Sequence, residues 1–263
     1  MIGLFLGEKD LPNEIVKKIK RKKIKYFIID LTKNNKFKKN KNSFFINIGK
    51  FGEILKLIKS KKCNKVIFAG NIIKPKLSKL KLDIRGLFYI PRIVKASKLG
   101  DAAILKVLIK ILSENKIKVI KLNTFNPELT LKKGIYTKIK PNFLEKAEIV
   151  KGIKTLKKIN SYNHTQAVII RDNKIVSKET RKGTKAMIKS NLKSKIERGI
   201  LIKMPKAKQD LRVDLPTIGI ETFKDCNKAG IKGIVVKSNQ NIILNKEVSI
   251  KYANQNKLFL IAI

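Results

Sequence analysis

Short apolar segments alternate with segments of helical spacing along the first half of this 263-residue chain. The apolar segments are rich in aromatic and β-branched residues, as β-strands are. The segments between them carry apolar side chains three and four residues apart, the spacing of an amphipathic helix. The predicted strands are 2–6, 25–30, 44–48, 65–69 and 118–122, and the predicted helices are 14–23, 51–61 and 102–112. This alternation predicts a parallel sheet covered by helices, a Rossmann-like α/β domain.

The second half has a different order of elements. Two strands, 166–171 and 174–179, are separated only by Asp172-Asn173, a pair suited to the positive φ of a tight turn. The other predicted helices are 143–159, 183–196, 221–229 and 246–256, and the other predicted strands are 199–204, 233–237 and 258–263. We therefore expect two α/β domains, an N-terminal one over 1–135 and a C-terminal one with a mixed sheet over 143–263. The Pro- and Gly-containing segment 126–142 is interpreted as their connection.

The formal net charge of +43 at first suggests a nucleic-acid-binding protein. Nearly all of the excess is lysine, spread over almost every segment, whereas nucleic-acid-binding proteins concentrate charge on one face and add arginine or stacking aromatic residues. Lysine, isoleucine, asparagine and phenylalanine share A/T-rich codons, so we attribute the composition to an A/T-rich genome. We expect no specific nucleic-acid partner, although the charge favours contact with anionic lipid head groups.

The cysteine and histidine content argues against several kinds of site. Cys63 and Cys226 lie far apart without CxxC spacing, which predicts free thiols in a reducing compartment. His164 is the only histidine, so neither a His-based triad nor a multi-histidine zinc site is expected. No window approaches the roughly 20 apolar residues of a membrane span. These features predict a cytoplasmic protein that can contact the inner-membrane surface.

The run KMPKAKQDLRVDLPTIG at 203–219 places two carboxylates and several cations between two apolar segments. In extended backbone, Asp210, Arg212 and Asp214 would project from one face, because side chains two residues apart share a face of a strand. Two carboxylates can hold a hard cation such as Mg²⁺, and Arg and Lys can hold phosphate oxygens. The alternative is a hairpin with a solvated charged face, and the spacing alone favours neither interpretation.

Two further candidate regions lie where predicted strands end. Gly7 and Asp10 follow the first strand, and Gly70, Asn71 and Lys74 follow the strand at 65–69. In open parallel sheets, the carboxyl ends of strands face the ligand crevice. Asp10 could contact a sugar or ribose hydroxyl or simply cap a helix, and the residues from Gly70 to Lys74 could face a ligand or simply begin a loop.

The apolar segment 80–100 admits two interpretations. It contains Leu87, Phe88, Tyr89 and Arg92, and it is too apolar for an ordinary loop. It could line a hydrophobic pocket or form a core helix, and the spacing of its apolar residues favours the core helix.

Taken together, these runs resemble one family, the UDP-2,3-diacylglucosamine pyrophosphatases of lipid A synthesis that are unrelated to calcineurin-like phosphoesterases. The matching segments follow the family's order and cover nearly the whole chain. They are GLFLGEKDLP (3–12), FGEILKLIK (51–59), VIFAGNIIKP (66–75), GLFYIPRI (86–93), GDAAILKVL (100–108), QAVIIRDNKIV (166–176), KGTKAMI (182–188), ILIKMPKAKQDLRVDLPTIG (200–219) and AGIKGIVV (229–236). The segment 200–219 is the most specific of them.

The resemblance implies a homodimer of two-domain subunits that hold a lipid-linked UDP-sugar substrate. It implies Mg²⁺-dependent hydrolysis of the pyrophosphate bond of UDP-2,3-diacylglucosamine, which releases UMP and 2,3-diacylglucosamine 1-phosphate in a Gram-negative cell. The family uses an aspartate of this run, here Asp210 or Asp214, and both are candidate catalytic residues and metal ligands. The acyl chains need an apolar lining, for which 80–100 is the candidate.

Several polar residues of the matching segments are expected to bind the substrate. Lys203 and Arg212 would bind phosphoryl oxygens, Lys185 could assist, and Gln209 could hydrogen-bond the nucleotide or sugar. Thr184 and Thr217, within the segments 182–188 and 200–219, complete the substrate-binding candidates.

The chain departs from the family pattern at several acids. The family's EGTDAM segment reads KGTKAM at 182–187, so Lys182 and Lys185 replace two acids. Ala102 replaces an acid and Lys9 a glycine. Fewer acids would weaken metal binding if those side chains are ligands. The alternative function is therefore a non-catalytic homologue that binds a lipid or a nucleotide sugar.

Overall fold

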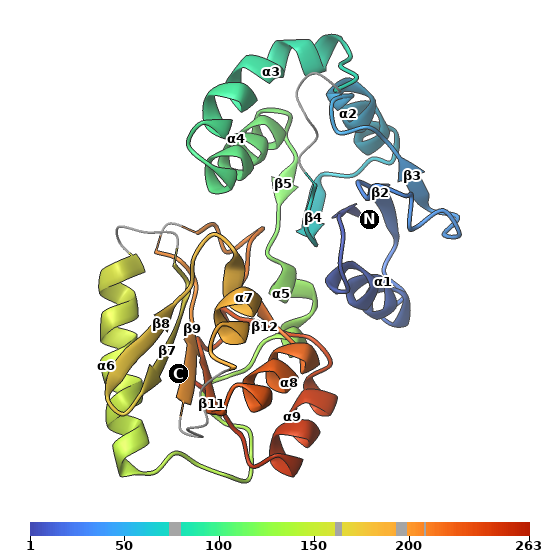
Figure 1. Cartoon of the computed structure of the whole chain (residues 1–263). Helices are drawn as coiled ribbons and strands as arrows, with labels where there is room; N and C mark the ends of the chain where they lie inside the picture. The colour runs from blue at the N-terminus through green and yellow to red at the C-terminus, as the bar shows by residue number, and fades with distance from the viewer. Residues whose placement is uncertain (74–79, 161–164, 193–198, 208) are drawn as a thin grey trace. The chain divides into compact units, whose positions relative to one another are not determined.

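The computed structural model describes residues 1–73, 80–160, 165–192, 199–207 and 209–263 (Figure 1). Two predicted residues, Lys74 and His164, lie outside these ranges. By its internal contacts the chain divides into unit 1, Met1–Asn126, and unit 2, Pro127–Ile263. Each unit is an α/β domain with its own sheet, as the alternation of elements predicted.

Unit 1 is built on a five-stranded parallel sheet with the order β3-β2-β1-β4-β5. All five residues of the central strand β1 are buried, as expected for a parallel sheet covered on both faces. The Rossmann-like arrangement is therefore confirmed. The strands are β1 (Ile2–Leu6), β2 (Tyr26–Asp30), β3 (Ser43–Phe45), β4 (Lys65–Ala69) and β5 (Lys118–Val119).

The helices of unit 1 differ from the prediction mainly at their ends. The first helix begins three residues early, at Leu11, because Pro12 fits the first turn, where an N–H group is not needed. The strand predicted at 118–122 stops at Val119, and a short helix begins at Leu122. The helices are α1 (Leu11–Arg21), α2 (Phe51–Ser60), α3 (Ile84–Ser97), α4 (Asp101–Glu114) and α5 (Leu122–Phe125).

The prediction that 80–100 forms a core helix is wrong for one face of α3. Tyr89 is buried as predicted, but Leu87 and Phe88 are exposed. Helical spacing of apolar residues indicates which side chains share a face, but not whether another element covers that face.

Unit 2 contains a six-stranded mixed sheet with the order β6-β13-β11-β9-β7-β8. Strands β9, β11 and β13 are parallel, while β7 runs antiparallel to both β8 and β9. The β7–β8 turn is the predicted one, with Asp172 at φ 48° and Asn173 at φ 57°. The strands are β6 (Gly134–Ile135), β7 (Ala167–Arg171), β8 (Lys174–Lys178), β9 (Gly199–Lys203), β11 (Ile231–Val236) and β13 (Phe259–Ala262), and β10 (Thr217–Ile218) and β12 (Ile242–Ile243) form a separate parallel pair.

Alternate residues of the unit 2 strands pack against helices on opposite faces of the sheet (Figure 1). On one face, Ile200 and Ile202 pack with Leu156 of α6, and on the other, Leu201 packs with Phe223 of α8. This alternation follows from the two-residue period of a strand. The helices are α6 (Phe143–Asn160), α7 (Gly183–Lys189), α8 (Ile220–Lys228) and α9 (Lys246–Gln255).

The segment 126–142 is more ordered than a simple connection. It contains a 3₁₀ turn, Pro127–Leu129, and β6, which pairs antiparallel with β13. Part of the segment therefore belongs to the sheet of unit 2. The predicted helix 183–196 ends earlier, at Lys189, and its last four residues lie outside the described ranges.

Candidate functional site

The charged run lies between β9 and β10, where the described residues 204–207 and 209–216 form a loop. The carbonyl oxygen of Asp210 accepts hydrogen bonds from the N–H groups of Val213 (3.1 Å) and Asp214 (3.0 Å). Residues 210–214 therefore form a turn, so the extended conformation considered from the sequence is wrong. The hairpin is wrong as well, because β9 and β10, on either side of the run, belong to different sheets. The i to i+4 closure of the turn still brings positions 210 and 214 to one side of the chain, as in one turn of a helix.

Asp210 and Arg212 form a paired unit within this turn. The Asp210 carboxylate accepts hydrogen bonds from Arg212 Nη2 at 2.6 Å and from Nε at 2.9 Å. It also accepts one from the Arg212 backbone N–H at 3.0 Å. Hydrogen bonding to Asp210 raises the pKa of Arg212 above its usual value. This bidentate contact fixes the plane of the guanidinium group.

Asp214 is the carboxylate of this turn better placed to serve a ligand. Within the described residues, no hydrogen bond or ion pair is made by its side chain, which is partly buried. The described part of the chain contains no cluster of three or more His, Cys, Asp or Glu side chains suited to a metal. Mg²⁺ is commonly bound by one or two carboxylates together with substrate phosphates. The donor set of this turn would suit magnesium in that form, with Asp214 as the candidate protein ligand.

A buried network of polar side chains lies at the base of the loop. The Lys203 ammonium group, at the end of β9, donates to Thr184 Oγ1 (2.9 Å) and to the carbonyl oxygen of Thr217 (3.2 Å). The Thr184 hydroxyl in turn donates to Glu179 Oε1 at 2.6 Å. Lys203 thus joins the two ends of the loop, because Thr217 is the first residue of β10.

Glu179 is a functional candidate that sequence reasoning missed. Besides Thr184, it accepts a hydrogen bond from the Gln166 N–H at 2.9 Å, and it is only 6% exposed. It directly follows β8, which ends at the same edge of the sheet as β9. In the first half of the chain, residues near the carboxyl end of a strand are candidates. The same rule, applied to the predicted strand 174–179, would have identified Glu179.

Two other predicted residues of the run, Gln209 and Thr217, form hydrogen bonds within the loop. Gln209 Oε1 accepts a hydrogen bond from the Lys206 N–H at 2.9 Å, which closes a short turn. The Thr217 hydroxyl donates to the Leu215 carbonyl at 3.1 Å. The structure therefore brings Thr184, Lys203 and Thr217 together, and it gives Gln209 a position within the same loop.

The predicted residues of unit 1 meet at the carboxyl edge of its sheet. The turns after β1 and β4 are paired, with the Glu8 N–H donating to the Asn71 carbonyl at 2.7 Å. A Cβ on Gly7 would lie 2.3 Å from that carbonyl oxygen, and Gly70 adopts φ +83°. Glycine is thus required at position 7 by the close approach of the backbone and at position 70 by the positive φ.

Asp10 lies beside this edge, exposed, at the N-cap position of α1, and makes no side-chain capping hydrogen bond there. The neighbouring Glu8 accepts from the Lys33 N–H at 2.8 Å and pairs with Lys36. The hydrogen bond from Lys36 lowers the pKa of Glu8. Glu8 therefore ties the first turn to the loop after β2, and Asp10 is left facing solvent.

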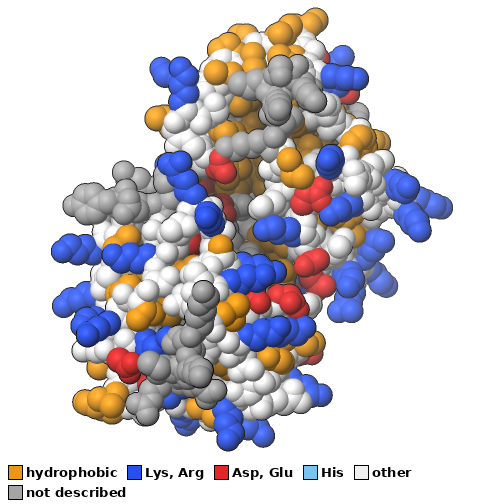
Figure 2. All heavy atoms as spheres, in the orientation of Figure 1, with side chains coloured by type: hydrophobic (Ala, Val, Ile, Leu, Met, Phe, Trp, Pro, Cys, Tyr) orange, Lys and Arg blue, Asp and Glu red, His pale blue; other side chains and the backbone are white. Residues whose placement is uncertain are grey.

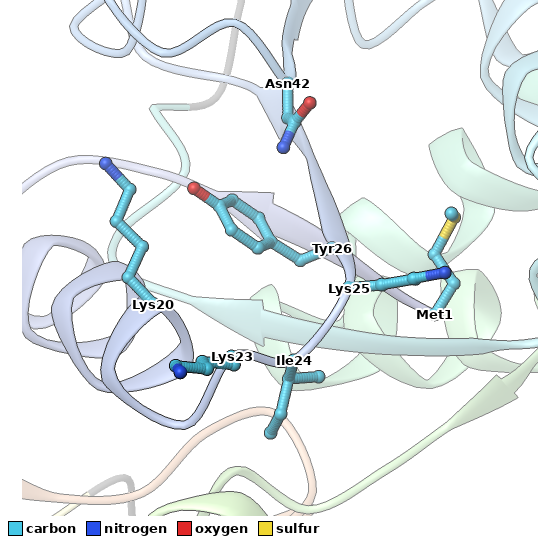
Figure 3. Close-up of a pocket in the computed structure, with 7 residues that line it drawn as sticks. All are labelled: Met1, Lys20, Lys23, Ile24, Lys25, Tyr26 and Asn42. Carbon is cyan, nitrogen blue, oxygen red and sulfur yellow. The ribbon is translucent and has the colours of Figure 1, made fainter.

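A pocket of about 390 Å³ lies at the opposite edge of the unit 1 sheet. Figure 3 shows its lining, which includes Met1 before β1, Tyr26 at the start of β2, and Lys20 of α1. These residues stand at the amino ends of the strands, whereas ligands of open parallel sheets bind at the carboxyl ends. The pocket is therefore not a candidate for the predicted site.

Comparison with known proteins accounts for both units. Residues 1–129 match the LpxI N-terminal domain, and residues 132–261 match the LpxI C-terminal domain. A protein of Caulobacter vibrioides named UDP-2,3-diacylglucosamine pyrophosphatase LpxI is 30% identical over 226 residues, which cover 83% of this chain and 81% of the relative. The chain belongs to the LpxI family.

Proposed function

We propose that this protein is a UDP-2,3-diacylglucosamine pyrophosphatase that releases UMP and 2,3-diacylglucosamine 1-phosphate in lipid A biosynthesis. Membership of the LpxI family supports the reaction class. The observation that carries the assignment of the site is the turn at 210–214, which holds an oriented arginine beside an aspartate without side-chain partners among the described residues. Pyrophosphate hydrolysis needs those two elements, a cation for phosphoryl oxygens and a carboxylate for water or metal.

Arg212 is proposed to bind the pyrophosphate. Its Nε and Nη2 groups are occupied by Asp210, so its remaining N–H groups are directed by that contact. An arginine that is already oriented loses less conformational freedom when it binds phosphate oxygens. Asp210 acts through Arg212 and is therefore proposed as a positioning residue.

Asp214 is proposed as the carboxylate that contacts the reacting groups. One oxygen would accept a hydrogen bond from the attacking water, and the other would hold the metal. Magnesium, when bound, would neutralise charge on the phosphoryl oxygens. Lys203 and Thr184 would keep the loop in place through the Thr217 carbonyl.

The lipid-linked substrate suggests where the protein works. We propose a cytoplasmic homodimer that contacts the inner-membrane surface. Among the described residues, no helix is long and apolar enough to cross a membrane. The net charge of +43 supports attraction to an anionic membrane surface.

The reaction is tested by UMP release from UDP-2,3-diacylglucosamine with Mg²⁺ and with a chelator. We expect metal-dependent release of UMP and 2,3-diacylglucosamine 1-phosphate in equal amounts. Asp210→Asn should reduce turnover by about 10- to 100-fold, since Arg212 remains but loses its fixed orientation, a charge-assisted contact worth about 1.5–3 kcal/mol. Substrate hydrolysis at another bond, or at equal rates with the chelator, would contradict the proposal.

A non-catalytic binding protein is the second candidate. Lys182 and Lys185 stand where the family pattern carries acids, and Lys185 is exposed at the start of α7. This function predicts stoichiometric retention of UDP-2,3-diacylglucosamine without UMP release at any Mg²⁺ concentration. The same assay, combined with mass spectrometry of the bound lipid, separates the two candidates.

A further inference from the structure

Helix α3 of unit 1 presents an apolar stripe to solvent. Ile84, Leu87 and Phe88 are 86%, 58% and 72% exposed, and Pro91 one turn later is also exposed. Their spacing of three, four and seven residues places them on one side of the helix. Figure 2 shows hydrophobic side chains gathered at the end of unit 1 that Figure 1 labels α3. We call these four residues the α3 stripe.

The stripe faces outward because the other side of α3 is held by packing. Tyr89 and Ala96 are buried, and the Tyr89 ring makes an edge contact with Phe51 of α2 at 5.5 Å between centroids. Asp83 accepts hydrogen bonds from the N–H groups of Gly86 and Glu53, which ties α3 to α2. Rotation of the helix to bury the stripe would break these contacts.

A basic groove continues from the stripe. Ile84 lines a groove of about 980 Å³ between α2, α3 and the end of α4. Its charged lining consists of four cations, Lys56, Lys59, Arg85 and Lys116, and two acids, Glu53 and Asp83. Glu53 is paired with Lys50 at 2.7 Å, and Asp83 is used to cap two helices. The groove is therefore net positive, next to an apolar edge.

We propose that the α3 stripe and the basic groove dock this protein on the surface of an anionic phospholipid bilayer. Apolar side chains on an amphipathic helix enter the boundary between head groups and acyl chains, while flanking cations contact lipid phosphates. The four cations of the groove complement lipid phosphates, whereas the same surface of a second copy would bring like charges together. This inference rests on the membrane contact proposed above, but not on the hydrolytic reaction, and docking would bring the protein to the membrane that contains lipid substrates.

The test is flotation of the full chain with vesicles, in the absence of nucleotide or sugar lipid. Vesicles of phosphatidylcholine with 30% phosphatidylglycerol, taken as a test composition, are compared with pure phosphatidylcholine. We expect binding to the anionic vesicles that weakens in high salt. The variant Leu87→Ser/Phe88→Ser should lower the partition coefficient at least tenfold, since the apolar area that these side chains bury in the lipid is lost.

The matched control is Phe143→Ser/Leu144→Ser, which removes the same two residue types at exposed positions of α6. It should bind the anionic vesicles as the wild type does. Equal binding by wild type and the α3 variant, or equal losses in both variants, would overturn the proposal. A wild-type dimer that dissociates on the α3 substitution and does not bind vesicles would assign the stripe to a second copy instead. Because no hydrolysis is measured, failure here leaves the proposed reaction to its own test.

Discussion

The carboxyl edges of the two sheets are built in different ways. In unit 1 the edge is formed by backbone atoms. Gly7 and Gly70 allow two turns to approach closely, and the peptide groups of Asn71 join these turns by hydrogen bonds. In unit 2 the edge consists of buried polar side chains, with Lys203 and Thr184 fixing a loop that carries further charges. The same position in an α/β fold thus provides a shaped surface in one unit and an ionic site in the other. This difference is the reason for proposing that the chemistry takes place in unit 2.

The unit 1 edge should be sensitive to any added side-chain atom. Gly7→Ala would place a methyl group 2.3 Å from the Asn71 carbonyl oxygen, which is backbone and cannot rotate away. We expect a loss of about 3 kcal/mol in the free energy of unfolding of unit 1, measured by urea denaturation. Gly183→Ala at the unit 2 edge meets no atom within 4 Å and should cost only about 1–2 kcal/mol, for its φ of +84°. Equal losses would show that close backbone approach does not distinguish the two edges.

The unit 2 edge should depend on a single hydroxyl group. Thr184→Val keeps the side-chain shape but leaves the buried Lys203 and Glu179 without the hydroxyl that links them. The expected loss is about 2 kcal/mol in the free energy of unfolding of unit 2. The control Thr217→Val removes only a local hydrogen bond to Leu215 and should cost less than about 1 kcal/mol. If both variants unfold at the same urea concentration, the network does not stabilise the edge.

Asp83, which orients the α3 stripe, should make a smaller contribution to the free energy of unfolding of unit 1, and this contribution should depend on pH. Partial burial raises the pKa of Asp83, but hydrogen bonds from the N–H groups of Gly86, Gly52 and Glu53 outweigh it, so the pKa lies below its usual value. A carboxyl with a lowered pKa stabilises the folded state above its unfolded pKa, about 3.9, and this contribution is lost as the pH falls through the folded value.

Asp83→Asn should therefore cost unit 1 about 1 kcal/mol at neutral pH, the scale of a helix cap. The difference from the wild type should shrink below about pH 4 and vanish below the folded pKa. Urea denaturation of both proteins across this pH range measures the difference in their free energies of unfolding. A difference that stays constant with pH would show that the charge of Asp83 plays no part.

The sequence predicted the sheets of both units better than it predicted their edges. Buried strands such as Ile2–Leu6 and Lys65–Ala69 were found because short apolar segments between helices have few alternative structures. The turn at Asp172-Asn173 was found because it requires positive φ. These features depend on local sequence, which is why the fold class can be predicted from the sequence alone.

The features missed by the sequence depend on what lies next to a segment in space. Spacing of two and four residues suits an extended strand as well as a single turn, so Asp210 and Asp214 could not be assigned to a turn. The exposure of Phe88 depends on which element covers α3, and apolar spacing says nothing about that. The role of Glu179 depends on Thr184 and Lys203, and the three residues come from the ends of three different elements, β8, α7 and β9.

The proposal that the chemistry takes place at the edge of unit 2 is tested most directly by replacing one exposed or partly exposed aspartate at each edge. Asp214→Asn and Asp10→Asn make the same chemical change, in unit 2 and in unit 1, and Asp172→Asn in an exposed turn serves as the control. The measurement is the kcat for UMP release from UDP-2,3-diacylglucosamine at saturating Mg²⁺. We predict that Asp214→Asn lowers kcat by about 10³-fold, as expected on loss of a carboxylate that contacts the reacting groups, while Asp10→Asn changes it less than about tenfold. Full activity in Asp214→Asn, or a larger loss in Asp10→Asn, would contradict the placement of the chemistry in unit 2.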